Sequence, residues 1–216
     1  MFKLAIFDLD QTLVDTLPRF HKIFNMALKN FGCNEVSWND FIKRYKDDTL
    51  NYYVCVDHRT FWDWFLSHYN DIKCDGDKLI PGAKETLKEL KKMEMKIAII
   101  TGRMVSPNSV MKELDEFSLS SFVDLVYTRL NNYCDGRRRT ELIIEAMKYF
   151  NVNKDETFFV GDYWPDMQSG REAGILTIGV LTGHENPEKL MENGADFVIE
   201  SVEELVPTLK ERGFIH

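Results

Sequence analysis

Two short acidic motifs lie near opposite ends of the 216-residue chain, and each directly follows an apolar run typical of a buried strand. The first motif is Asp8-Leu9-Asp10-Gln11-Thr12, and the second is Gly161-Asp162-Tyr163-Trp164-Pro165-Asp166. An ionised carboxylate at the end of a buried strand is costly to desolvate unless it is paired or bound to a cation. Since Mg²⁺ prefers oxygen ligands and often binds phosphates too, these motifs predict a magnesium site and metal-assisted chemistry on a phosphate ester.

A third polar pair, Thr101-Gly102, follows the apolar run at residues 96–100. Open parallel sheets present their functional groups at the carboxyl ends of strands, so we expect this pair to lie near the acidic motifs. The Thr101 hydroxyl and the Gly102 N–H can both bind phosphate oxygens, because no side chain on Gly102 prevents close approach. Asp8 and Asp10 can flank one site, where one carboxylate attacks phosphorus and the other handles the proton.

Apolar runs and helical periodicity predict the elements that position these residues. Strand-like runs occupy residues 2–7, 96–100, 122–127, 157–160, 176–180 and 197–199, and amphipathic helical patterns fill most of the intervals. This alternation predicts an α/β fold with a Rossmann-like, doubly wound and mostly parallel sheet.

The interval between the first two runs differs, because residues 16–79 contain no strand-like run and carry aromatic residues at helical spacing. We therefore expect an α/β core domain formed by residues 1–15 and 80–216, with an inserted α-helical domain at residues 16–79. A lid over the active site is the sharper interpretation of this insertion.

Composition limits the other classes of function. A net charge of -8 argues against non-specific binding of nucleic acids or membranes, which requires a basic face. The four cysteines lack the spacing of a metal site, and we expect reduced, structural thiols. The first apolar run is too short for a signal peptide or a membrane span, so we expect a cytoplasmic protein.

The motifs together resemble those of the haloacid dehalogenase (HAD)-like hydrolase superfamily, in particular its phosphoglycolate phosphatase-like branch, which carries a helical cap between the first and second motifs. The resemblance covers nearly the whole chain. It rests on Asp8-Leu9-Asp10-Gln11-Thr12-Leu13-Val14-Asp15-Thr16, Ile99-Ile100-Thr101-Gly102-Arg103 and Val160-Gly161-Asp162-Tyr163-Trp164-Pro165-Asp166.

The resemblance implies a role for each matching residue. Asp8 would be the nucleophile and a metal ligand, and Asp10 would be the acid/base, with its backbone carbonyl also binding the metal. Thr101 and Gly102 would bind phosphate. Asp162 would be the acidic metal ligand of the last motif, with Asp166 in a supporting role. The dehalogenating members lack an acid at the position of Asp10, so halide chemistry is not expected.

Two positions depart from the family pattern. Gln11 stands where the family usually has Gly. The family also supplies a Lys at the start of the helix before the last motif, and counting back from Ala146 and Val152 places that position at Arg137, with Arg138 as the second choice. An arginine keeps the positive charge and adds a planar fork of donors.

Three functions remain open at this stage. The first is a Mg²⁺-dependent phosphatase that hydrolyses a small phosphorylated metabolite, such as a phosphoglycolate-like compound, a sugar phosphate or a nucleotide monophosphate, through an aspartyl-phosphate. The others are a phosphosugar mutase of the same superfamily and a catalytically weakened phosphate-sensing or binding protein. We expect the phosphatase, acting as a monomer or homodimer without nucleic-acid or membrane partners.

Overall fold

The computed structural model of the chain describes residues 1–69, 76–131 and 139–215. The chain divides into two compact units. We call Met1–Val14 with Leu79–His216 the sheet unit, and Asp15–Lys78 the helical unit. Two short strands that the apolar pattern does not predict, β2 (Val14–Asp15) and β3 (Lys78–Leu79), pair where the chain passes between the units.

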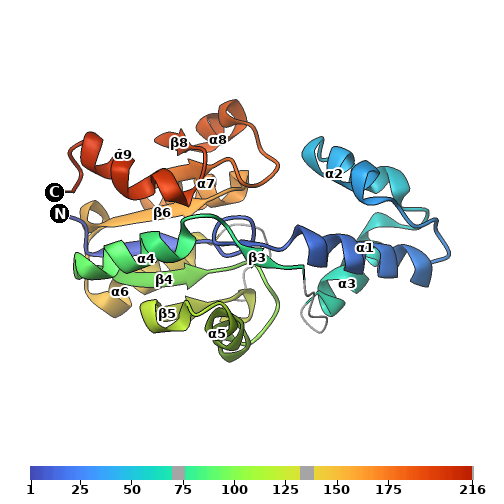
Figure 1. Cartoon of the computed structure of the whole chain (residues 1–216), viewed down its shortest axis with the longest axis horizontal. Coiled ribbons are helices and arrows are strands. Elements are labelled where there is room, and N and C mark those ends of the chain that lie inside the picture. Colours follow the sequence, from blue (N-terminus) through green and yellow to red (C-terminus); the bar gives the residue numbers. More distant parts are fainter. Residues whose placement is uncertain (70–75, 132–138, 216) are drawn as a thin grey trace. The chain divides into compact units, whose positions relative to one another are not determined.

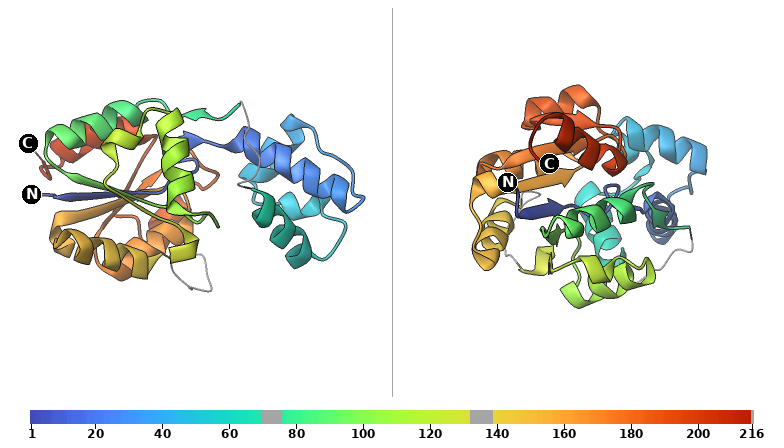
Figure 2. Two further views of the ribbon diagram at one scale, coloured as in Figure 1. Left: turned by 90° about the horizontal axis from the view of Figure 1, so that it is seen from below. Right: turned by 60° about the vertical axis from the view of Figure 1, so that its left-hand side comes forward.

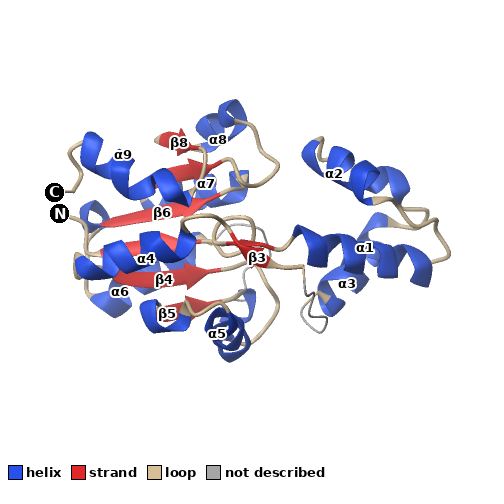
Figure 3. Ribbon diagram, in the orientation of Figure 1, coloured by secondary structure: helices blue, strands red, loops and turns tan. Residues whose placement is uncertain are grey.

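The sheet unit is built on a parallel sheet, which in the described part of the chain has six strands in the order β5-β4-β1-β6-β7-β8 (Figures 1 and 3). The strands are β1 (Leu4–Phe7), β4 (Lys96–Ile100), β5 (Leu125–Tyr127), β6 (Thr157–Gly161), β7 (Leu176–Val180) and β8 (Phe197–Ile199). From β1 the chain adds β4 and β5 on one side of the sheet, and then returns to add β6, β7 and β8 on the other side. This is the switch in strand order beside which open α/β sheets bind ligands.

Helices cover both faces of this sheet, so the predicted doubly wound α/β fold is confirmed. One face packs against α4 (Ala83–Lys92), α5 (Pro107–Glu116) and α9 (Leu205–Glu211), and the other against α6 (Thr140–Phe150), α7 (Trp164–Ala173) and α8 (Pro187–Asn193). Figure 2, left, shows α4 and α9 on one side of the strands and α6 and α7 on the other.

The central strand β1 is buried on both faces of the sheet, so water is excluded around it. Its alternate side chains enter opposite cores: Ala5 and Phe7 pack in one cluster, and Leu4 and Ile6 pack in the other. All four are fully buried, and burial of one large aliphatic or aromatic side chain contributes about 1.5–3 kcal/mol. Polar groups that directly follow β1 therefore lie next to an apolar interior.

Short 3-10 helices complete the connections of the sheet unit. One of them shortens a predicted strand, because η2 (Ser120–Phe122) occupies the start of the apolar run at residues 122–127 and β5 begins only at Leu125. The others are η3 (Arg129–Asn131), η4 (Lys154–Glu156) and η5 (Val202–Glu204).

The helical unit contains α1 (Leu17–Asn30), α2 (Trp38–Lys46), η1 (Leu50–Tyr53) and α3 (His58–His68). Its core is aromatic, with Phe24, Phe41 and Phe61 fully buried against one another. The side chains of Ser37 and Asp57 cap α2 and α3 by accepting backbone N–H bonds, which stabilises a helix start by about 1 kcal/mol. None of the described helices is long and apolar enough to cross a membrane.

A disulfide joins Cys33 to Cys55 in the helical unit, so the expectation of reduced thiols is wrong for this pair. Their Cα atoms lie 5.7 Å apart although 22 positions separate them in the chain. The two segments meet through the packing of α1 against α3, and cysteine spacing alone carries no signal of such a contact. Cys74 and Cys134 lie outside the described residues.

This bridge predicts a reductant-sensitive stability. A cross-link that closes a loop of about 20 residues stabilises a fold by about 2–4 kcal/mol. We therefore expect a reducing agent to lower the thermal unfolding midpoint of the wild type, followed by circular dichroism, and to leave Cys33→Ser/Cys55→Ser unchanged. Equal midpoints for the wild type with and without reductant would contradict the bridge.

Candidate active site

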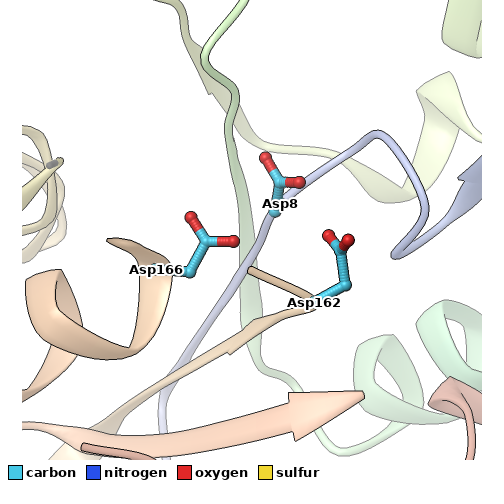
Figure 4. A group of neighbouring side chains, drawn as sticks. All are labelled: Asp8, Asp162 and Asp166. Carbon is cyan, nitrogen blue, oxygen red and sulfur yellow. The ribbon is translucent and has the colours of Figure 1, made fainter. Parts of the chain in front are cut away.

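Three buried carboxylates gather at the carboxyl edge of the sheet. Asp8 follows β1, Asp162 follows β6, and Asp166 lies in the first turn of α7, and one oxygen from each lies within 4.8 Å of the others (Figure 4). The chain thus brings together three of the residues that its sequence marks as a possible metal site.

Two glycines allow this crowding. A Cβ added to Gly161 would lie 2.6 Å from Asp166 Oδ2, and one added to Gly183 would overlap the Asp162 carboxylate. Hydrogen bonds then orient the two acids: Thr12 Oγ1 donates to Asp162 Oδ1 at 3.2 Å, and the Tyr163 N–H donates to Asp166 Oδ2 at 3.3 Å. Larger residues at either glycine would push the carboxylates apart.

Burial and mutual repulsion disfavour the ionised form of the clustered carboxylates. Burial raises the pKa of Asp8 from 3.8 to about 6; the Arg139 charge opposes this shift and the Asp10 charge adds to it. Burial, followed by the charge of Asp8, raises the pKa of Asp162 well above its ordinary value. Among the described residues, the buried Asp8 Oδ1 and Asp166 Oδ1 accept no well-aligned hydrogen bond, although each is in ion-pair contact with the Arg139 guanidinium group. Dry, closely spaced carboxylate oxygens fit a divalent cation such as Mg²⁺.

Arg139 brings a positive charge to the cluster. Its Nη2 lies 3.2 Å from Asp8 Oδ1, and its Nη1 forms an ion pair with Asp166 Oδ1. The residue directly precedes α6, and its backbone N–H donates to Ser169 Oγ at 2.6 Å, which ties the start of α6 to α7. The side chain therefore bridges the first and last acidic motifs.

Arg137 and Arg138, which counting along the chain favours, lie outside the described residues. Counting passes over Arg139, the described arginine that reaches the cluster. The start of the helix is the sequence feature that indicates Arg139, since the family places its cation there and α6 begins at the residue after Arg139. Counting back from hydrophobic positions does not use this helix boundary.

The Thr101-Gly102 pair lies at the neighbouring strand end. Thr101 is buried and its N–H donates to the Tyr127 carbonyl at 3.0 Å, which continues the pairing of β4 with β5. A Cβ added to Gly102 would lie 3.0 Å from Arg139 Nη2. Gly102 and the acidic cluster therefore border the same guanidinium group.

The Asp10 carboxylate is not part of the described acidic cluster. Both of its oxygens accept hydrogen bonds from Arg103, a residue to which the sequence motifs assign no role. Burial would lower the pKa of Arg103, but the charges of Asp10 and Glu113 raise it well above the ordinary value, so the arginine is firmly charged. The two acids of the first motif thus have different cationic partners.

Gln11 shows why the family usually has Gly at this position. Its φ of 60° lies in the left-handed region, which costs a residue with a side chain about 1–2 kcal/mol. Two hydrogen bonds hold the turn: the Gln11 N–H donates to the Val14 carbonyl at 2.7 Å, and Thr182 Oγ1 donates to the Gln11 carbonyl. The turn therefore keeps its shape without the glycine.

The fold and the site define a doubly wound α/β protein with an acidic centre at the carboxyl ends of neighbouring parallel strands. Residues 5–180 match the haloacid dehalogenase-like hydrolase family, and the chain belongs to it. This match confirms the family expected from the motifs and makes the chain an enzyme of the hydrolase class.

Named relatives span nearly the whole chain. It is 26% identical over 214 residues to the pyrophosphatase PpaX of Listeria monocytogenes, with 95% of each protein covered. It is 26% identical over 222 residues to the phosphoglycolate phosphatase of Pseudomonas syringae, covering 95% of this chain and 79% of that one. Among solved structures, a predicted phosphatase from Clostridium acetobutylicum shares the fold, with a TM-score of 0.75, 24% identity and coverage of 98% and 99%.

The raised pKa of Asp8 predicts an unusual pH dependence of stability. The folded protein holds the Asp8 proton to about pH 6, whereas the unfolded chain loses it near 3.8. Stability from this group is therefore complete below pH 4 and is lost as the pH rises through 6. In EDTA, we expect the unfolding free energy of Asp8→Asn minus that of the wild type to increase by about 1–3 kcal/mol from pH 4 to 7.

Urea denaturation of both proteins at several pH values measures this difference. More distant acids titrate equally in the two proteins to first order, so the subtraction isolates Asp8 together with Asp162, whose pKa the Asp8 charge raises. A difference that is flat, or that falls over this range, would show that Asp8 is not held in a charge-poor interior.

Proposed function

We propose that this enzyme is a Mg²⁺-dependent phosphatase that hydrolyses a small phosphorylated metabolite through an aspartyl-phosphate on Asp8. The observation that carries the proposal is the buried cluster of Asp8, Asp162 and Asp166, joined by Arg139, in a chain that belongs to a hydrolase family. The relatives named above support the phosphate chemistry.

Asp8 is the proposed nucleophile because its carboxylate lies beside those of Asp162 and Asp166 and its Oδ1 lies 3.2 Å from Arg139 Nη2. Asp8 and Asp162 would hold Mg²⁺, with the backbone carbonyl of Asp10 as a further ligand and Asp166 in support. When bound, the metal would neutralise charge on the transferring phosphoryl group.

Arg139 takes the cationic role for which the family uses a lysine. A guanidinium group offers two parallel N–H donors to a phosphate. It would exchange part of its contact with Asp8 and Asp166 for phosphoryl oxygens, while the Thr101 hydroxyl and the Gly102 N–H bind the remaining oxygens. Asp10 would protonate the leaving group and later activate water.

Two substrate classes come first from the named relatives: pyrophosphate and phosphoglycolate. Both are small, strongly anionic molecules, and both suit a site that offers Arg139 and would hold a metal ion. A structural likeness to a putative β-phosphoglucomutase from Bacteroides vulgatus, at 21% identity and a TM-score of 0.71, concerns the fold alone. No observation on the described residues favours a mutase.

The decisive experiment measures phosphate release from p-nitrophenyl phosphate, pyrophosphate, phosphoglycolate, a hexose phosphate and a nucleotide monophosphate, with Mg²⁺ and with EDTA. We expect metal-dependent release from at least one of these compounds, and a loss of more than 10³-fold in Asp8→Asn because the nucleophile is removed. The pH-dependent stability of Asp8→Asn, measured as above, checks that the variant folds.

Normal turnover by Asp8→Asn would contradict the assigned nucleophile. An isomeric sugar phosphate in place of free phosphate would indicate a mutase. Metal binding without release from any compound of the panel would favour a phosphate-binding protein.

Arg139 supports a second prediction. Arg139→Gln removes the cation from the phosphoryl site, and we expect kcat/KM to fall by about 10²–10³-fold, as for the loss of one donor to a developing charge. Arg139→Lys should recover part of this loss. Arg212→Gln is the control, since Arg212 lies over the ring of Phe197 at 4.3 Å, away from the acidic cluster. Equal activity in Arg139→Gln and wild type would return the role to an arginine outside the described residues.

A further inference from the structure

Arg103 is buried between two carboxylates. Its Nε donates to Asp10 Oδ2 at 2.8 Å and its Nη2 to Asp10 Oδ1 at 2.6 Å. On its other edge, Nη1 donates to Glu113 Oε2 at 2.6 Å and Nη2 to Glu113 Oε1 at 3.1 Å. Each carboxylate is therefore held by two hydrogen bonds in a planar fork, which fixes its orientation as well as its position.

Exposure separates the two ends of this arrangement. The Arg103 side chain is 4% exposed, whereas that of Asp10 is 27% exposed. A substrate can therefore reach Asp10, while Arg103 is covered by protein. Any effect of Arg103 on a bound substrate must then act through Asp10.

Arg103 is itself held at its backbone and by α5. Its N–H donates to Thr101 Oγ1 at 3.4 Å, and its carbonyl accepts the Arg129 N–H at 3.0 Å. Glu113 belongs to α5, so the far side of the guanidinium group is fixed to a helix of the sheet unit. Only the arginine of this group is fully buried, since the Glu113 side chain is 17% exposed and that of Asp10 is more exposed still. Placing a guanidinium group in the interior is costly, and here it is used to hold a carboxylate at the edge of the proposed site.

We propose that Arg103, held by Glu113, is a positioning residue that fixes the Asp10 carboxyl group for proton transfer to and from the substrate. The inference rests on the proposed function, because that function makes Asp10 the acid/base. Arg103 contacts no reacting atom and would leave the attack by Asp8 intact.

The two proton transfers by Asp10 are the steps whose rates should depend on how its carboxyl group is oriented. As an Asp8 oxygen bonds to phosphorus and the ester P–O bond breaks, Asp10 gives its proton to the departing oxygen. In the second step, Asp10 takes a proton from the water that attacks the aspartyl-phosphate, and inorganic phosphate leaves. An alkoxide leaving group needs the first proton, whereas p-nitrophenolate is stable enough to depart with little help.

The test compares phosphoglycolate, an alkyl ester, with p-nitrophenyl phosphate. For Arg103→Gln we expect kcat on the alkyl ester to fall by about 10²-fold, within the usual range for general acid catalysis, and kcat on the aryl ester to fall at least tenfold less. KM should change little for either, since phosphate binding is untouched. Arg103→Lys, with a single ammonium group, should recover part of the loss, and Glu113→Gln should show a smaller loss with the same selectivity.

Coupling to Asp10 is the second readout. In an Asp10→Asn background, Arg103→Gln should cause no further loss beyond about twofold on the alkyl ester, because the group it positions is already disabled. Lys91→Gln serves as the control for removal of a partly buried cation, since Lys91 binds Asp124 at 2.7 Å ahead of β5. This control should leave the ratio of the two activities unchanged.

Equal losses on both esters with a lowered unfolding midpoint, or fully additive losses in the Asp10→Asn background, would overturn the proposal and leave Arg103 a structural residue. If the wild type hydrolyses neither ester nor any other compound of the panel, the proposed function fails. Crystal structures of wild type and Arg103→Gln then decide the positioning: several Asp10 orientations in the variant would support it, and one unchanged orientation would overturn it.

Discussion

Burying three neighbouring carboxylates at the carboxyl edge of the sheet costs free energy, and the rest of the site is arranged around this cost. β1 and β6 are buried on both faces, so Asp8 and Asp162 emerge from an apolar interior, and Asp166 joins them within 4.8 Å. Most nearby features reduce this cost or permit the crowding: the Arg139 charge, the Thr12 hydrogen bond, the glycines beside the carboxylates, and the first turn of α7, whose dipole favours an acid. The carboxylates that remain uncompensated are the reason the proposed function assigns this cluster a small, highly charged cation.

The two acids of the Asp8-x-Asp10 motif contact different arginines. Residues only two apart would ordinarily share one environment, but Asp8 faces Arg139 and the acidic cluster, whereas Asp10 faces Arg103 and Glu113. Different surroundings give chemically identical groups different tasks. Asp8 lies among the acids proposed as metal ligands, whereas the Asp10 carboxyl group is held by a buried arginine.

The sequence predicts well those features that depend on local patterns. Apolar runs locate all six strands of the sheet in the described residues, and position after a strand identifies Asp8, Thr101 and Asp162 as residues at its carboxyl edge. Features that depend on packing between distant segments are missed. The Cys33–Cys55 bridge, the pairing of β2 with β3 and the Arg103–Asp10 contact each join residues whose spacing has no characteristic period. The contact of Arg139 with Asp8 and Asp166 is likewise not predicted, because a run of three arginines offers several equivalent cations.

The two departures from the family pattern have different physical consequences. Gln11 adopts the left-handed backbone that favours glycine, so its cost falls on stability, and the bonds to Val14 and Thr182 offset it without changing the geometry of the motif. An arginine in the position proposed for the family's lysine instead changes which groups the cationic side chain can contact. A lysine presents one point charge, whereas the guanidinium group of Arg139 contacts Asp8 with one nitrogen and Asp166 with another. It therefore holds the first and last motifs in register before any ligand arrives. In the proposed mechanism, a phosphoryl group would compete with those carboxylates for the guanidinium donors. Substrate binding would then depend on neutralisation of the acidic cluster more strongly than it would with a lysine.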